Sequence, residues 1–267
     1  MNLVEQIRKW QHKRAREIVP PDNKIERAIG GLKGRAFFPE GLGLQRLNRP
    51  TEYPQPDILV VGHNFGTLDY RKKLAEELEG SEENEPTWRN LKSLLGDVMD
   101  RCFMTNWFIG FGSNQTGKFL PNHTCNSGCS PSETKCSIRK YEEECLNLII
   151  NQIRVLKPKA VLLLGEEVIR RAHKIAPDND RLKSWHRIKA SRFFSEVDKI
   201  GALASNVDVP EEDFTTNFVA LIQPSFHMQN HAHRAPEALR VKLTQARKEC
   251  QTAGRQAEID LIRKSLE

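Results

Sequence analysis

Four short segments, each with a run of consecutive apolar residues, recur along the 267-residue chain, at 57–62, 102–106, 160–165 and 218–222. Runs of this length, rich in branched side chains, are typical of strands buried on both faces of a parallel sheet. Helical patterns lie between and after them, at 68–79, 90–101, 138–156, 166–174 and 236–264. Strands that alternate with helices predict an α/β fold, here a three-layer α/β/α sandwich around a largely parallel, four-stranded sheet.

The chain divides into two parts in this interpretation. Residues 1–56 comprise an amphipathic helix over 1–18 and then an irregular stretch, rich in glycine and proline, that we expect to wrap over the surface. Residues 57–267 form the α/β domain, with an insertion at about 178–215.

Charge and cysteine usage restrict the class of protein. Lys and Arg number 41 against 35 Asp and Glu, a net charge of +6, which is a mild indication of a polyanionic partner. No window is apolar for long enough to span a membrane, and the charged start does not resemble a signal peptide. The six cysteines are therefore expected to be free thiols in a reducing compartment. We expect a cytoplasmic monomer.

Polar and glycine clusters follow three of the four predicted strands. They are Gly62-His-Asn-Phe-Gly66, Thr105-Asn106 and Gln223-Pro-Ser225. In open α/β sheets, ligands bind beyond the carboxyl ends of the strands. The three turns are therefore predicted to form one site.

Taken in chain order, these motifs resemble those of the uracil-DNA glycosylase superfamily. In that family a first strand ends in Gly-x-(Asp/Asn/Glu)-Pro, a second in Asn and a late one in (His/Asn)-Pro-Ser. The segment 156–165, Leu-Lys-Pro followed by an apolar strand and Leu-Gly, is similar to another family element. The resemblance covers roughly 55–245, and the Asn in the first motif is that of the mismatch-type and single-strand-selective branches.

The resemblance implies a monofunctional DNA glycosylase that needs no cofactor. Such an enzyme hydrolyses the N-glycosidic bond of a flipped pyrimidine and leaves an abasic site. Asn64 would orient the water and Gln223 would donate to the base oxygen, while Gly62, His63 and Asn106 would bind the base.

Two of these residues depart from the family's fastest branch. Asn64 replaces an aspartate and cannot take up a proton, and general-base catalysis is worth about 10²–10⁴-fold. Gln223 replaces the usual His or Asn but keeps a neutral donor. Slow base release is therefore expected.

The first motif also bears on which base is accepted. Phe65 stands where the family has proline, and the usual base-stacking Phe is missing, so Phe65, Tyr70 and Phe108 are candidates for that role. Gly66 replaces a tyrosine that blocks substituents on C5 of the pyrimidine ring. The base-binding residues Phe65 and Gly66 thus predict a pocket for uracil or a C5-modified pyrimidine, including modified cytosine in phage DNA, with a role in repair or in antiviral defence.

The family inserts the loop after its third motif into the minor groove of DNA. In this chain the wedge candidates are Phe226, His227 and Met228, and Ser225 and Arg234 are the candidate phosphate contacts.

A second DNA-binding region is predicted in the basic run 181–192. It carries five cations and no acid, among them Lys183 and Arg187, with Trp185 placed to stack on a base. The alternative for this run is a solvated helix face.

Other interpretations remain beside this one. The three turns after the predicted strands could be ordinary connections that have no functional role. Because Asn64 and Gln223 are uncharged, the chain could also be an inactive superfamily member that binds modified or single-stranded DNA. The segment 112–118 nearly spells a phosphate-binding loop, but Phe119 stands where magnesium needs Ser or Thr, which excludes a nucleotide triphosphatase.

The cysteines leave a further question open. We predict no metal site, because an iron–sulfur cluster of the family's kind would need cysteines before Cys102. Zinc bound by His123, Cys125, Cys129 and Cys136 is the alternative, and free thiols with Cys145 packed on its helix are the simpler reading.

Overall fold

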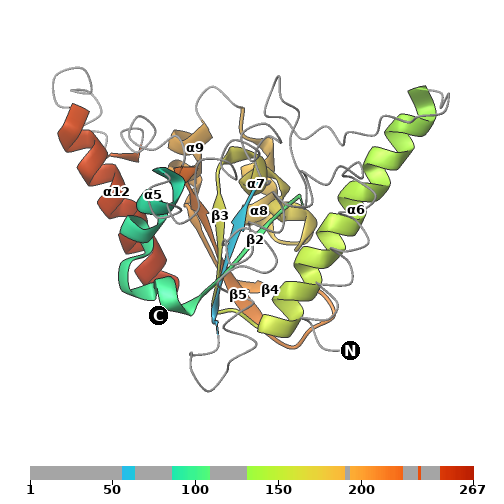
Figure 1. The fold of residues 1–267 in the computed structure, drawn as a ribbon, viewed down its shortest axis with the longest axis horizontal. Helices are drawn as coiled ribbons and strands as arrows, with labels where there is room; N and C mark the ends of the chain where they lie inside the picture. Colours follow the sequence, from blue (N-terminus) through green and yellow to red (C-terminus); the bar gives the residue numbers. More distant parts are fainter. Residues whose placement is uncertain (1–55, 64–85, 109–130, 190–192, 225–233, 236–246) are drawn as a thin grey trace, which may run out of the picture. The chain divides into compact units, whose positions relative to one another are not determined.

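The computed structural model describes residues 56–63, 86–108, 131–189, 193–224, 234–235 and 247–267 (Figure 1). The helices predicted at 1–18 and 68–79, the stretch up to residue 55 and the segment 112–118 lie outside these residues. The chain divides into two compact units, of which the second contains 56–62, 82–102 and 156–267 and the first the remainder up to residue 155.

A five-stranded, mostly parallel sheet runs through the fold in the order β2-β1-β3-β5-β4. Its strands are β1 (Ile58–Gly62), β2 (Cys102–Asn106), β3 (Ala160–Leu164), β4 (Leu203–Asp208) and β5 (Thr215–Leu221). β1 pairs with β3 and β3 with β5, both in parallel, whereas β4 pairs with β5 antiparallel. The predicted α/β class and largely parallel sheet are confirmed, but the predicted count of four strands is wrong.

The three central strands are buried as their composition predicts. Every residue of β1 and β3 is buried, and β5 is buried over its last four residues. Parallel strands covered on both faces need apolar side chains at consecutive positions. These segments are therefore the ones that the sequence identifies most clearly.

The strand β4 was not predicted, because its side chains are not apolar along its whole length. It is an edge strand whose sequence, Leu-Ala-Ser-Asn-Val-Asp, mixes buried, half-buried and exposed positions without regular alternation. The pairing shifts between Ala204 and Val207, and Asn206 adopts a φ of 51° at this irregularity. The backbone N–H of Asn206 donates to Asn217 Oδ1 on β5, which stabilises the bulge.

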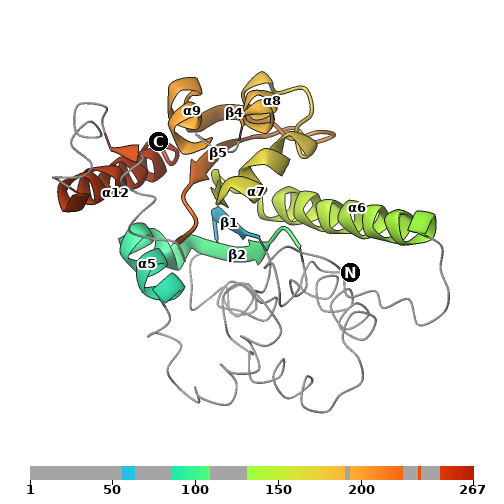
Figure 2. The same cartoon turned by 90° about the horizontal axis from the view of Figure 1, so that it is seen from above.

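Helices cover both faces of the sheet in the second unit (Figures 1 and 2): α5 and α12 lie side by side on one face and α7 lies on the other. The helical elements of this unit are α5 (Pro86–Leu95), η2 (Gly96–Arg101), α7 (Glu166–Arg171), η3 (Ala172–Lys174), α8 (Asp180–Arg187), α9 (Phe193–Ile200) and α12 (Arg247–Lys264).

Two of the predicted helices end in a tighter turn than expected. The patterns at 90–101 and 166–174 each begin as an α-helix and finish as a 3₁₀ helix, η2 and η3. The final helix is described from Arg247, with Cys250 buried as predicted. The segment predicted as an insertion, 178–215, forms α8, α9 and β4.

In the first unit, α6 (Pro131–Leu156) begins at Pro131 rather than at residue 138. Its buried face includes Cys145, Ile149 and Ile153, so the simpler reading of Cys145 is confirmed. Among the described residues, no helix combines the length and the apolar character needed to cross a membrane.

Candidate functional site

The carboxyl ends of β1, β3 and β5 lie at one edge of the sheet. Val61 pairs with Leu163, and Leu163 with Ala220, so these three strands end at the same level. Beyond this level the chain continues into Gly62, Gly165 and Gln223. This edge is where an open α/β sheet binds its ligands.

Gln223 lies directly across Gly165 at this edge. A Cβ on Gly165 would meet Gln223 Oε1 at 2.7 Å and Gln223 Cβ at 3.2 Å, and its φ of 88° is itself strained for any other residue. The backbone N–H of Gly165 also donates to Leu221 O over 2.8 Å. Gly165 is therefore a further residue of the candidate site that was not predicted from the sequence, although the Leu-Gly element that contains it was noted.

The side chain of Gln223 is half-buried, and no hydrogen bond joins it to any residue that the structure describes. The next residue is held from α5, where Asn90 Nδ2 donates to Pro224 O over 2.9 Å. A fixed backbone with an uncommitted amide is suited to donating to a ligand. Asn90 carried no signal in the sequence that would distinguish it from other polar helix residues.

Arg234 is buried, with only 1 % of its side chain exposed. Its Nη1 donates to Glu258 Oε1 over 2.8 Å and its Nη2 to Ala220 O over 2.5 Å. Asp198 Oδ1 lies 3.4 Å from Nε, and the guanidinium stands over the ring of Phe194. The predicted phosphate contact of Arg234 is therefore wrong, because interior groups surround and neutralise its charge.

The partner of Arg234 is a fully buried carboxylate on α12. Burial raises the pKa of Glu258 to about 7, and the attraction of Arg234 opposes this only in part. Glu258 Oε1 also accepts the backbone N–H of Ile222 over 2.7 Å. A glutamate in a charged helix looks like a surface residue, so the sequence did not point to it.

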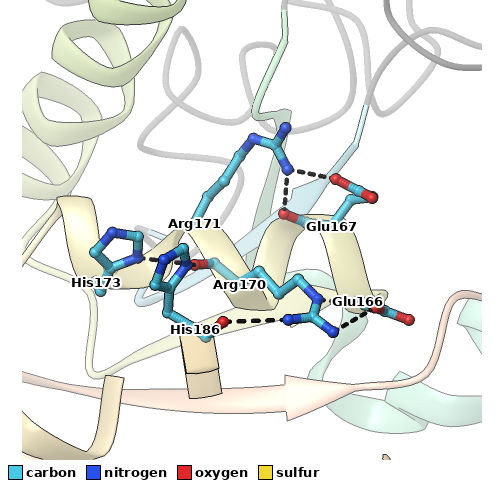
Figure 3. Close-up of polar contacts among 6 residues, drawn as sticks. All are labelled: Glu166, Glu167, Arg170, Arg171, His173 and His186. Atoms are coloured by element: carbon cyan, nitrogen blue, oxygen red, sulfur yellow. Dashed lines mark hydrogen bonds and ion pairs between the residues drawn. The ribbon is translucent and has the colours of Figure 1, made fainter. Parts of the chain in front are cut away.

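The charges on α7, which follows β3, neutralise one another (Figure 3). Glu166 pairs with Arg170 over 2.8 Å and Glu167 with Arg171 over 2.5 Å, each at helical i,i+4 spacing. Acids in the first turn of α7 and cations in its last turn also complement the helix dipole, and the direct pairs add to this effect. As a result, the two glutamates do not leave an unbalanced negative charge at this edge.

A pair of histidines joins η3, which follows α7 directly, to α8 (Figure 3). The rings of His173 and His186 lie 4.0 Å apart, and Nδ1 of each contacts Arg170 O. Arg170 Nη1 in turn donates to His186 O. Partial burial lowers the pKa of His173, and the neighbouring His186 and Lys174 lower it further. This cluster connects the helices.

The basic run 181–192 forms α8 over its first part. Leu182 and Trp185 are buried, and the Trp185 indole N–H donates to Gly201 O over 3.0 Å. The prediction that Trp185 stacks on a base is therefore wrong, because the ring belongs to the core. Lys183 lies 3.6 Å from Asp180, and Arg187 is exposed, so the predicted DNA contacts of these two cations stay predictions.

We expect Trp185→Phe to lower the free energy of unfolding by about 1–2 kcal/mol. The smaller ring keeps most of the packing but leaves the part-buried Gly201 carbonyl without its indole donor. Denaturant unfolding measures the change, and DNA affinity serves as the second readout. Reduced DNA affinity at unchanged stability would contradict the core assignment of Trp185.

His63, Asn106 and Phe108 belong to the first unit. Asn106 is buried at the last position of β2. The Phe108 ring meets His63 edge to face at 5.5 Å, and the Phe108 N–H donates to His63 O over 2.9 Å. Phe108 and Asn106 are each only 1 % exposed, and their predicted contacts with a base stay predictions. Phe65, Tyr70 and Phe108 remain the candidates for the stacking role.

Several predicted site residues lie outside the described residues: Asn64, Phe65, Gly66, Tyr70, Ser225, Phe226, His227 and Met228, together with His123, Cys125 and Cys129. In the part of the chain that the structure does describe, no three metal-ligating side chains come together. Cys102, Cys145 and Cys250 are buried there and are not joined in a disulfide among the described residues.

A comparison of the sequence with models of known protein families finds no match. A comparison with curated proteins finds no match either.

Proposed function

We propose that this protein is a DNA glycosylase that releases a flipped pyrimidine base and leaves an abasic site. The observation that carries the proposal is the half-buried amide of Gln223, which lies across Gly165 at the carboxyl edge of the sheet and makes no hydrogen bond with the residues that the structure describes. Helices on both faces of a mostly parallel sheet are compatible with the three-layer fold of the uracil-DNA glycosylase type, which we propose as the finer assignment.

The chemistry requires a donor where negative charge develops. As the N-glycosidic bond breaks, the sugar becomes positive and the departing base becomes negative. A preorganised neutral donor stabilises that negative charge, and losing one such donor costs about 10²–10³-fold in rate. The Gln223 N–H groups are the donors in this proposal.

The other two amides have complementary roles. Asn64 orients the attacking water towards the sugar carbon, and Asn106 binds the edge of the pyrimidine through one donor and one acceptor. Neither Asn64 nor Gln223 takes up a proton, so we expect slow turnover. The partner is DNA, whose target nucleotide leaves the stack at a cost of about a few kcal/mol.

The test is a panel of oligonucleotides, single- and double-stranded, that contain uracil, mismatched thymine or C5-modified cytosines. Alkaline strand scission detects the abasic sites. We expect scission with at least one base and tolerance of C5 substituents, because Gly66 leaves that side of the ring open. Asn64→Ala should lose base release while its DNA affinity stays within a few-fold of wild type.

Two results would change this proposal. Release of unmodified uracil with rejection of every C5-modified base would contradict the role given to Gly66. Tight binding to DNA without scission of any substrate would favour the second candidate, an inactive DNA-binding member of the same superfamily. The uncharged amides at positions 64 and 223 are the observation that favours it.

A further inference from the structure

The carboxyl end of β5 is completed by two side chains instead of a neighbouring strand. The Ala220 N–H donates to Ala202 O, but β4 begins only at Leu203. Along a strand, the backbone groups of residues two apart point to the same side, so the Ile222 N–H faces beyond the start of β4. Glu258 accepts that N–H, and Arg234 donates to Ala220 O.

These contacts hold the backbone that leads to Gln223 on both sides. On the β3 side, the Gly165 N–H binds Leu221 O over 2.8 Å. On the β4 side, the Ile222 N–H lies 2.7 Å from Glu258 Oε1. The direction in which the chain enters Gln223 therefore depends on a carboxylate 36 residues away in the sequence.

From these contacts we propose that Glu258, together with Arg234, is a positioning pair that holds Gln223 in place to donate to the departing base. The inference rests on the proposed function. Glu258 touches neither substrate nor reacting atoms in this scheme, and it acts through the backbone of Ile222.

Stability alone accounts poorly for such a pair. Replacing a buried ion pair by apolar residues of similar volume is often neutral or stabilising, because two desolvated charges cost much of what their attraction supplies. Glu258 is fully buried, and burial raises its pKa to about 7. What the pair supplies, and an apolar pair could not, is a donor for Ala220 O in β5 and an acceptor for the Ile222 N–H just beyond it.

The test uses two variants of Glu258 in the full chain. Glu258→Gln keeps an acceptor for the Ile222 N–H, whereas Glu258→Leu removes it. We expect Glu258→Leu to lose base release by about 10–100-fold, the range found for residues that orient the ligands of a metal site. Glu258→Gln should rescue most of that loss, and the loss should appear in kcat more than in KM.

A second readout needs no substrate. Hydrogen exchange of the Ile222 amide, followed by NMR, should accelerate in Glu258→Leu and remain slow in Glu258→Gln. The side-chain amide resonances of Gln223 should shift in the leucine variant only. If no base is released from any substrate but these NMR changes occur, the proposed function fails while the positioning contact stands.

A double-variant comparison separates positioning from general stability. In a Gln223→Ala background, Glu258→Leu should cause little further loss of base release, because the side chain that it positions is gone. Additive losses would overturn the proposal. So would an unchanged Ile222 amide in Glu258→Leu, or a glutamine variant as inactive as the leucine variant.

The matched control is a second Arg–carboxylate pair at the opposite end of the sheet. Arg101 binds Asp57 through two hydrogen bonds, of 2.9 and 2.6 Å, at the start of β1. Asp57→Asn should alter stability but leave the Ile222 amide and base release within a few-fold of wild type. An equal loss of base release in Asp57→Asn would overturn the specific role of Glu258.

Discussion

Replacing Arg234 with alanine is expected to lower the free energy of unfolding by about 3–5 kcal/mol. The substitution leaves the carboxylate of Glu258 in the interior without the cation 2.8 Å away, and Ala220 O without its donor. Asp198 loses the same partner. Urea denaturation followed by circular dichroism measures the change.

The deficit of Arg234→Ala should depend on pH in a defined direction. The pKa of Glu258 is raised from 4.5 to about 7 in the folded protein. The contribution of this group to the free energy of unfolding is therefore greatest below pH 4.5 and is lost as pH rises from 4.5 through 7. The positive charge of Arg234 stabilises the ionised carboxylate of Glu258, whereas the negative charge of Asp198 destabilises it. We therefore expect a larger deficit at pH 8 than at pH 5, where Glu258 is mostly protonated.

Arg187→Ala is the matched control, because Arg187 is exposed on α8. Its stability should stay within about 0.5 kcal/mol of wild type. If Arg187 contacts phosphate, the Arg187→Ala variant should bind DNA more weakly, and the slope of log affinity against log salt concentration should become about one unit shallower. An Arg234→Ala protein as stable as wild type, with that change in DNA binding, would restore the phosphate role of Arg234.

Gly165→Ala is expected to lower the rate of base release by about 10²–10³-fold, which is the effect expected when a single preorganised donor such as Gln223 is lost. The new Cβ would lie 2.7 Å from Gln223 Oε1, so the flexible amide must turn aside. The φ of 88° adds a stability cost of about 1–3 kcal/mol. Single-turnover base release and denaturant unfolding separate the two effects.

Gly96→Ala serves as the control for backbone strain. Gly96 also has a positive φ, of 53°, but a Cβ there would meet nothing within 4 Å. This variant should lose some stability and keep base release. If Gly165→Ala were as active as Gly96→Ala, the Gln223 amide would not be the donor that the reaction uses.

The parts of the fold that were predicted share one physical property. Strands buried on both faces are apolar at every position, so β1, β3 and most of β5 could be located from side-chain type alone. The edge strand β4 could not, because half-exposed positions with a bulge leave no periodic pattern. The start of β5 was predicted at 218 rather than at Thr215, because its first three residues are polar and include exposed and half-buried positions.

The residues of the candidate site also differ in whether the sequence alone points to them. A motif at the end of a buried strand is visible in the sequence, and Gln223 was predicted in this way. Glu258 and Asn90 were not, because their importance comes from the backbone groups that they bind, 36 and 134 residues away. Chain topology alone brings such residues together.

Arg187 and Arg234 show what the sequence determines and what only the tertiary structure determines. The sequence by itself determined that the chain forms an α/β sheet with polar turns after its strands, because composition and periodicity are local properties. It could not determine which cations face solvent. Only the tertiary structure buried Arg234 against Glu258, 24 residues further along, and left Arg187 exposed. The reason is that a charge remains in the interior only where folding places its partner.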